Sequence, residues 1–112
     1  MKSDEVCLGH ILDEIDFLLK QSDSVSFDQF IKDDVLKRAF ARSFEIIGEA
    51  VKNLSADFRR RHRHVEWKNI AGFRDRLIHS YFDVNWNVLW NIVKEKVPEL
   101  KPQIEELLQG MK

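Results

Sequence analysis

One stretch in the second half of the chain contains residue types that suit metal-independent RNA cleavage. Arg74, His79 and Tyr81 form an Arg-x4-His-x-Tyr motif. A histidine with the ordinary pKa of about 6.5 is substantially neutral at working pH and can accept the proton of a ribose 2'-hydroxyl as that oxygen attacks the adjacent phosphate. An arginine keeps its charge and offers a planar fork to the phosphoryl oxygens, where negative charge builds. In this interpretation Arg74 and His79 are the catalytic pair.

The same residues also have an ordinary structural interpretation, in which Arg74 and Asp75 form a surface ion pair and His79 is a half-buried structural histidine. Asp75 stands four residues before His79. On a continuous helix the two side chains are neighbours, so Asp75 can orient His79. A single histidine cannot easily remove one proton and deliver another to the leaving 5'-oxygen, so a two-fold homodimer that supplies a second His79 is expected.

The elements that must position these residues are helices, because glycine and proline are rare and apolar residues recur at three- and four-residue steps. The pattern predicts helices over about Asp4 to Gln21, from Asp33 or Asp34 to about Leu54, over about Val65 to Ser80 with the motif, from about Trp86 to a point before Pro98, and over about Pro102 to Gln109. The fold class predicted is all-α: an antiparallel four-helix bundle with an extra short C-terminal helix, in a single domain over 1–112.

Several positions on these helices have two interpretations. Gly48 lies inside a long helix, where glycine costs roughly 1 kcal/mol against alanine, so the close approach of another helix is the natural compensation. Glu49 beside it is either a surface acid or a polar group directed at the active site. Trp86 and Trp90 belong either to the core or to a dimer interface.

The net charge of −1 rules out the long-range positive field of a domain that coats a duplex. Any contact with nucleic acid is therefore local. The one dense basic stretch contains Arg59, Arg60, Arg61 and Arg63, interleaved with His62 and His64. It either steers RNA or is a solvated connection between helices.

The composition also excludes several classes of protein. Cys7 is the only cysteine, which excludes an intramolecular disulfide and favours a reducing compartment. No apolar run approaches the roughly 18 to 20 residues that cross a bilayer, and the amino terminus is too acidic for a signal peptide, so a cytoplasmic protein without membrane contact is expected. The four histidines are scattered and no glycine-rich phosphate loop is present, so neither a metal site nor a cofactor is expected.

Three segments around the motif carry a family resemblance. They are FEIIGEAVKNLS (Phe44 to Ser55), WKNIAGFRDRLIHSYFDV (Trp67 to Val84) and VLWNIVKEKVPELKPQIEELL (Val88 to Leu108). In order and spacing they resemble the HepT family of HEPN-domain toxins. The resemblance implies a dimeric helical ribonuclease, the toxin of a toxin–antitoxin module whose antitoxin is a minimal (MNT-type) nucleotidyltransferase. It makes Arg74 and His79 the catalytic pair and Tyr81 a residue to which such an antitoxin adds AMP.

The chain departs from the family pattern at two positions. The family usually places Asn after the motif arginine, where this chain has Asp75, and often has Pro before the tryptophan, where this chain has Glu66. The charge of Asp75 can pair with Arg74 or raise the pKa of His79 by favouring imidazolium, which predicts a weaker nuclease. The alternative function is a non-catalytic helical subunit that binds a nucleotidyltransferase together with a nucleotide or phosphate ligand.

Overall fold

The computed structural model describes residues 3–80 and 83–111, and for residues 79 and 80 it describes the backbone. Its elements are α1 (Asp4–Asp23), α2 (Phe27–Ile31), α3 (Asp34–Asn53), α4 (Ala56–Arg61), α5 (Trp67–Ala71), α6 (Phe73–Leu77), β1 (Ile78–Ser80), β2 (Asp83–Val84), α7 (Trp86–Glu95) and α8 (Val97–Gln109). The predicted all-α class is confirmed, with one small antiparallel hairpin added between α6 and α7.

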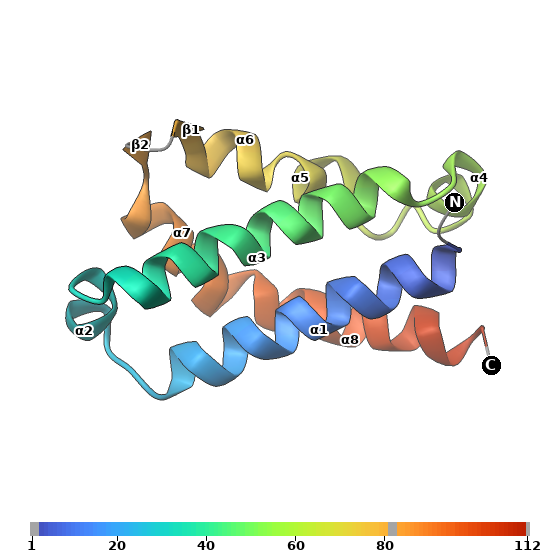
Figure 1. The fold of residues 1–112 in the computed structure, drawn as a ribbon. Helices are drawn as coiled ribbons and strands as arrows, with labels where there is room; N and C mark the ends of the chain where they lie inside the picture. The colour runs from blue at the N-terminus through green and yellow to red at the C-terminus, as the bar shows by residue number, and fades with distance from the viewer. Residues whose placement is uncertain (1–2, 81–82, 112) are drawn as a thin grey trace.

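In the bundle, α1 runs antiparallel to both α3 and α8. Figure 1 shows α1 between α3 and α8, with α5 and α6 following one another along α3. The apolar residues that recur at three- and four-residue steps in α1 are buried: Leu8, Ile11, Ile15 and Leu18 are all fully inaccessible to solvent. Each such side chain contributes about 1.5–3 kcal/mol by leaving water. This burial holds α1 at the centre of the bundle.

Polar caps decide where several helices begin. Asp33 accepts a hydrogen bond from the backbone N–H of Leu36 at 2.9 Å, and Asn85 accepts one from that of Val88 at 3.2 Å. Each bond satisfies a donor that the first turn of a helix leaves unpaired. The predicted starts of the long helix α3 and of α7 are therefore confirmed.

An aromatic cluster closes one end of the bundle. The ring of Phe30 in α2 lies 4.9 Å from those of Phe40 and Trp90 and 6.1 Å from that of Trp86, measured between centroids. Trp86 and Trp90 are partly buried against the core. Core packing, one of the two interpretations of these tryptophans, therefore explains the part of each ring that is buried.

The helix predicted over Val65 to Ser80 is wrong in its continuity and its end. The segment instead forms two short helices, α5 and α6. They are separated at Gly72, where a φ of −82° and a ψ of −6° depart from regular α-helical values. The chain then becomes extended at Ile78, which pairs with Val84, while the N–H of Asn85 donates to the carbonyl of Leu77 at 2.9 Å. The hairpin ends the helix at Leu77, so His79 lies on β1.

The last helix also differs from its prediction. It begins at Val97 and not near Pro102, and a single residue, Lys96, separates it from α7. Pro98 is tolerated because the N–H groups of the first turn have no partner in the helix. Val97, Leu100, Ile104 and Leu107 are buried, and this burial offsets the bond lost at Pro102. No helix within the described ranges has the length and apolarity needed to span a membrane.

Candidate functional site

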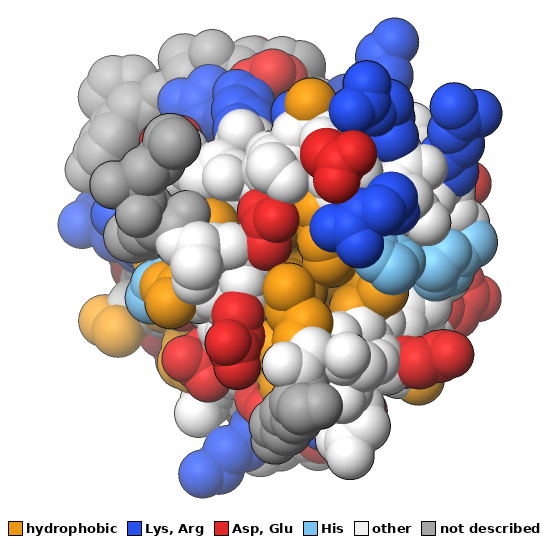
Figure 2. All heavy atoms as spheres, turned by 90° about the vertical axis from the view of Figure 1, so that its right-hand side faces the viewer, with side chains coloured by type: hydrophobic (Ala, Val, Ile, Leu, Met, Phe, Trp, Pro, Cys, Tyr) orange, Lys and Arg blue, Asp and Glu red, His pale blue; other side chains and the backbone are white. Residues whose placement is uncertain are grey.

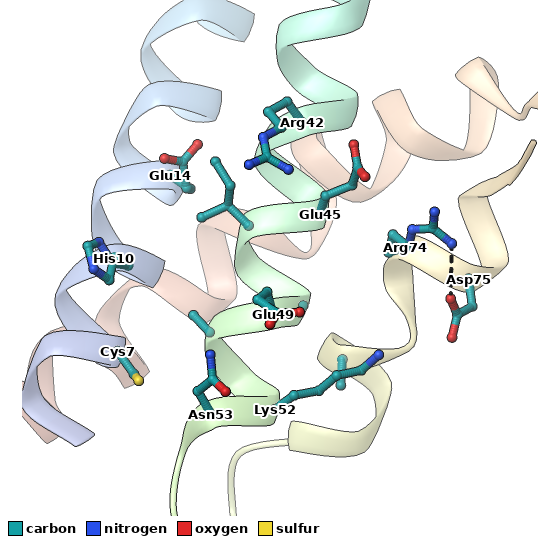
Figure 3. Close-up of a pocket in the computed structure, with 14 residues that line it drawn as sticks. Cys7, His10, Glu14, Arg42, Glu45, Glu49, Lys52, Asn53, Arg74 and Asp75 are labelled. Atoms are coloured by element: carbon teal, nitrogen blue, oxygen red, sulfur yellow. Dashed lines mark hydrogen bonds and ion pairs between the residues drawn. The ribbon is translucent and has the colours of Figure 1, made fainter. Parts of the chain in front are cut away.

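A surface hollow of about 660 Å³ lies where α1, α3 and the α5–α6 segment meet. Most of its lining is charged or polar. The side chains in Figure 3 come from α1 (Cys7, His10, Glu14), from α3 (Arg42, Glu45, Glu49, Lys52, Asn53) and from α6 (Arg74, Asp75). Of the predicted site residues, Arg74, Asp75 and Glu49 therefore share one hollow.

Gly48 allows α3 to approach α5 and α6 closely, as its position in the sequence predicted. A Cβ atom at Gly48 would stand 3.3 Å from the carbonyl oxygen of Ala71 and 3.9 Å from the Cβ of Arg74. A contact of 3.3 Å is tighter than side chains normally make, so a larger residue would push the two segments apart. Arg74 and Glu49, both exposed, therefore line the same hollow.

Two apolar side chains fix the orientation of α6. Phe73 and Leu77 are buried, and the ring of Phe73 meets that of Phe44 edge-on at 5.9 Å. Because these residues face the core, Arg74 and Asp75 face outward on the other side of this short helix, with 47% and 68% of their side chains exposed. Solvent and a ligand can therefore both reach the guanidinium.

Arg74 has one ionic partner among the described residues. Its Nη1 atom lies 3.5 Å from Oδ1 of Asp75, as the dashed line in Figure 3 marks. Exposed pairs of this kind contribute about 0–1 kcal/mol. A phosphate, which accepts two parallel hydrogen bonds from a guanidinium, competes well for Arg74.

The other two motif residues follow α6 in the chain. The backbone of His79 lies on β1 between Ile78, paired with Val84, and Ser80, paired with Asp83. The helix on which Asp75 and His79 were expected to be neighbours does not reach His79, because α6 ends two residues before it. The side chain of His79 lies outside the part of the chain that the structure describes, so its contact with Asp75 stays a prediction. Tyr81 lies outside the described residues.

The contribution of α1 to the hollow was not predicted. His10 and Glu14 stand one turn apart on α1, and Glu14 accepts a hydrogen bond from the hydroxyl of Ser43 at 2.7 Å. Ser43 is 2% exposed, so this bond ties α1 to α3 beneath the hollow. A polar residue on the buried side of the long helix is the signal that could have pointed to it. The described residues contain no group of three or more His, Cys, Asp or Glu placed to hold a metal ion.

The basic stretch lies away from this hollow, mostly on α4. Arg60 and Arg61 both bind the carboxylate of Asp57, at 3.3 and 3.0 Å. Their hydrogen bonds lower the pKa of Asp57 below its ordinary value. Two of the four arginines thus have an acidic partner on their own helix.

An all-α bundle of this size, with a charged hollow beside an Arg-x4-His segment, defines a HEPN-like helical protein. The family described as ribonuclease HepT-like matches residues 11–107. A protein of Caldanaerobacter subterraneus subsp. tengcongensis, provisionally named an RNase, is 52% identical over 112 residues that cover all of both chains. A provisionally named ribonuclease HepT of Thermococcus cleftensis is 40% identical over 89% of this chain and 91% of its own.

The chain therefore belongs to the HepT-like ribonuclease family. A further relative from Methanocaldococcus jannaschii, also provisionally named an RNase, is 41% identical over 94% of this chain and 87% of its own. No solved structure is significantly similar to the chain.

Proposed function

We propose that this protein is a metal-independent endoribonuclease in which Arg74 and His79 carry out the chemistry. The observation that supports the proposal best is the placement of Arg74. It stands exposed at the edge of a charged hollow, three residues from the end of the helix that leads into the strand of His79, in a chain of the HepT-like ribonuclease family. Its guanidinium binds the scissile phosphate and stabilises the charge that develops on the phosphoryl oxygens.

The proposed reaction removes a proton from the attacking 2'-hydroxyl and delivers a proton to the leaving 5'-oxygen. The imidazole of His79 accepts the proton of the ribose 2'-hydroxyl, and the 2'-oxygen then forms a bond to phosphorus. The bond from phosphorus to the 5'-oxygen breaks, and that oxygen takes a proton from the His79 imidazolium of a second copy of the chain. The products are a 2',3'-cyclic phosphate and a 5'-hydroxyl, and the active form is a homodimer.

The products of RNA cleavage test this proposal. Incubated with RNA in EDTA, the protein should release fragments that end in a 2',3'-cyclic phosphate, identified by mass spectrometry. The same sequence with 2'-O-methyl riboses should stay intact, because the methylated oxygen cannot lose a proton and attack. Cleavage of the methylated strand, or fragments with a 3'-hydroxyl, would contradict the mechanism. Binding of RNA without any cleavage would favour the non-catalytic subunit instead.

The proposal extends to a toxin acting in the cytoplasm and silenced by an MNT-type nucleotidyltransferase antitoxin. AMP added to the hydroxyl of Tyr81 would bring a negative phosphate near Arg74. That phosphate would bind the guanidinium in place of the RNA phosphate. Tyr81 is a control point in this scheme, whereas Asp75 and Glu49 modulate the charge around Arg74. Co-expression with the antitoxin should add the mass of one AMP to the peptide that contains Tyr81. An adduct mapped to another residue would refute this part of the scheme.

A further inference from the structure

A second hollow, of about 340 Å³, lies where the end of α4 leads into α5. Arg59, Arg63, Glu66, Trp67, Lys68 and Asn69 line it. It shares no lining residue with the hollow of Arg74. Figure 2 looks at the end of the molecule that carries α4 and shows lysine, arginine and histidine side chains gathered on its upper right part.

The cations of this second hollow differ from their neighbours in having no acidic partner. Arg60 and Arg61 are bound by Asp57, whereas Arg59, Arg63 and Lys68 form no ion pair with any described residue. The only carboxylate in the lining is that of Glu66, which makes no capping hydrogen bond. The hollow therefore concentrates positive charge in a chain whose overall net charge is −1.

Arg59 also has a donor that is not used. Its Nε atom is buried and has no hydrogen-bond partner. A buried donor without an acceptor is unfavourable. The side chain as a whole is only partly buried and lines the hollow, so the remaining N–H groups of the guanidinium can still bind an anion. Arg59 is thus a residue whose hydrogen bonding is incomplete in the protein alone.

The base of the hollow is rigid. Trp67 is 6% exposed, and its Nε1–H donates to the carbonyl of His62 at 3.0 Å, across the turn between α4 and α5. Its ring also packs on that of Phe58, with 6.2 Å between centroids. These contacts hold the turn, so the cations sit on a fixed support and lose less freedom on binding a ligand.

We propose that this second hollow binds a backbone phosphate of the RNA strand away from the cleaved bond, an inference that rests on the proposed ribonuclease function. Lys68 stands six residues before Arg74, and α5 and α6 both pack on α3. The two short helices therefore follow one another along the same helix of the bundle, so one RNA strand that binds Arg74 passes close to the cations of the second hollow. Phosphate contacts set the register of a strand without reading its sequence.

An acidic protein surface is a poorer fit to the same cations. Protein interfaces have an apolar centre surrounded by polar groups. The apolar residues in this lining, Val65 and Trp67, are 2% and 6% exposed and offer almost no surface. A positively charged lining without an apolar centre is typical of a site that binds phosphate.

Binding of fluorescent single-stranded RNA by the catalytically disabled His79→Ala protein tests the inference. Adding Arg63→Gln and Lys68→Gln should raise the Kd about tenfold at low salt and lower the slope of log Kd against log salt by about 0.7–1.5. Adding Glu66→Gln should tighten binding by a few-fold. The matched control, Lys32→Gln with Arg38→Gln, removes the same charge from exposed positions at the α2 end and should change the Kd less than twofold.

Three results would overturn the inference: no change in Kd with the Arg63 and Lys68 pair, an equal change with the control pair, or competition by polyglutamate as strong as that by RNA. Cleavage assays on the parent chain separate it from the proposed function. Normal cleavage with an unchanged KM in the Arg63→Gln, Lys68→Gln protein would end the inference and leave the nuclease intact. If the parent chain never cleaves RNA, the nuclease proposal fails. Weaker RNA binding with the Arg63 and Lys68 pair but not with the control pair would then still support the inference.

Discussion

RNA cleavage is expected to fall by about 10²–10⁴-fold when His79 is replaced by alanine, because the variant has no general base for the 2'-hydroxyl. If two copies of His79 act as base and acid in the homodimer, the substitution removes both groups at once. The loss then lies at the upper end of this range. The measurement is the single-turnover rate of cleavage of a labelled RNA in EDTA.

Two variants control for nonspecific effects of the substitution. His64→Ala removes an exposed histidine from the turn before α5 and should leave the cleavage rate within twofold of the parent. Asp75→Asn removes the carboxylate 3.5 Å from Arg74 and should maintain or raise the rate, because the guanidinium is then free for phosphate. Cleavage by His79→Ala at the full rate would exclude His79 as the base.

The pH dependence follows from the same assignment. A base and an acid that are both histidines give a rate that rises and then falls with pH. A rate that rises steadily through pH 8 would show that the proton of the leaving oxygen comes from another source.

Most of the fold could be predicted from the sequence because its long helices are strongly periodic and well capped. The stripe from Leu8 to Leu18 and the caps Asp33 and Asn85 act within a few residues of the elements they define. Gly48 was informative for a similar reason, since glycine inside an apolar helix signals a close neighbour. Local signals of this kind do not depend on the rest of the structure.

The site was harder to predict because it depends on strand pairing and on contacts between segments that the helical periodicity does not show. The pairing of Ile78 with Val84 forms a tight hairpin, and it overrides the helical periodicity that continues through Leu77 and Ile78. The hollow also needs His10 and Glu14 from α1, at least sixty residues before Arg74. The family resemblance supplied the roles of Arg74 and His79, and the structure added the surface on which Arg74 lies.

Replacing Phe30 by alanine is expected to lower the free energy of unfolding by about 3–5 kcal/mol, the usual cost of removing a buried phenylalanine. The ring is fully buried and joins three helices through Phe40 of α3 and Trp86 and Trp90 of α7. Urea unfolding followed by tryptophan fluorescence measures the loss, at one protein concentration so that any dimer contributes equally. Val35→Ala, at a position 80% exposed on α3, should change the stability by less than about 0.5 kcal/mol.

The Phe30 variant also tests how the site is supported. α7 starts directly after the hairpin of His79, and its first turn packs on Phe30 through Trp86. Loosening that turn should release the hairpin before the rest of the bundle unfolds, so cleavage by Phe30→Ala should be lost at a lower temperature than helical circular dichroism. A loss of stability below 1 kcal/mol would mean that the tryptophans are held mainly by another surface, as the dimer-interface interpretation of Trp86 and Trp90 requires.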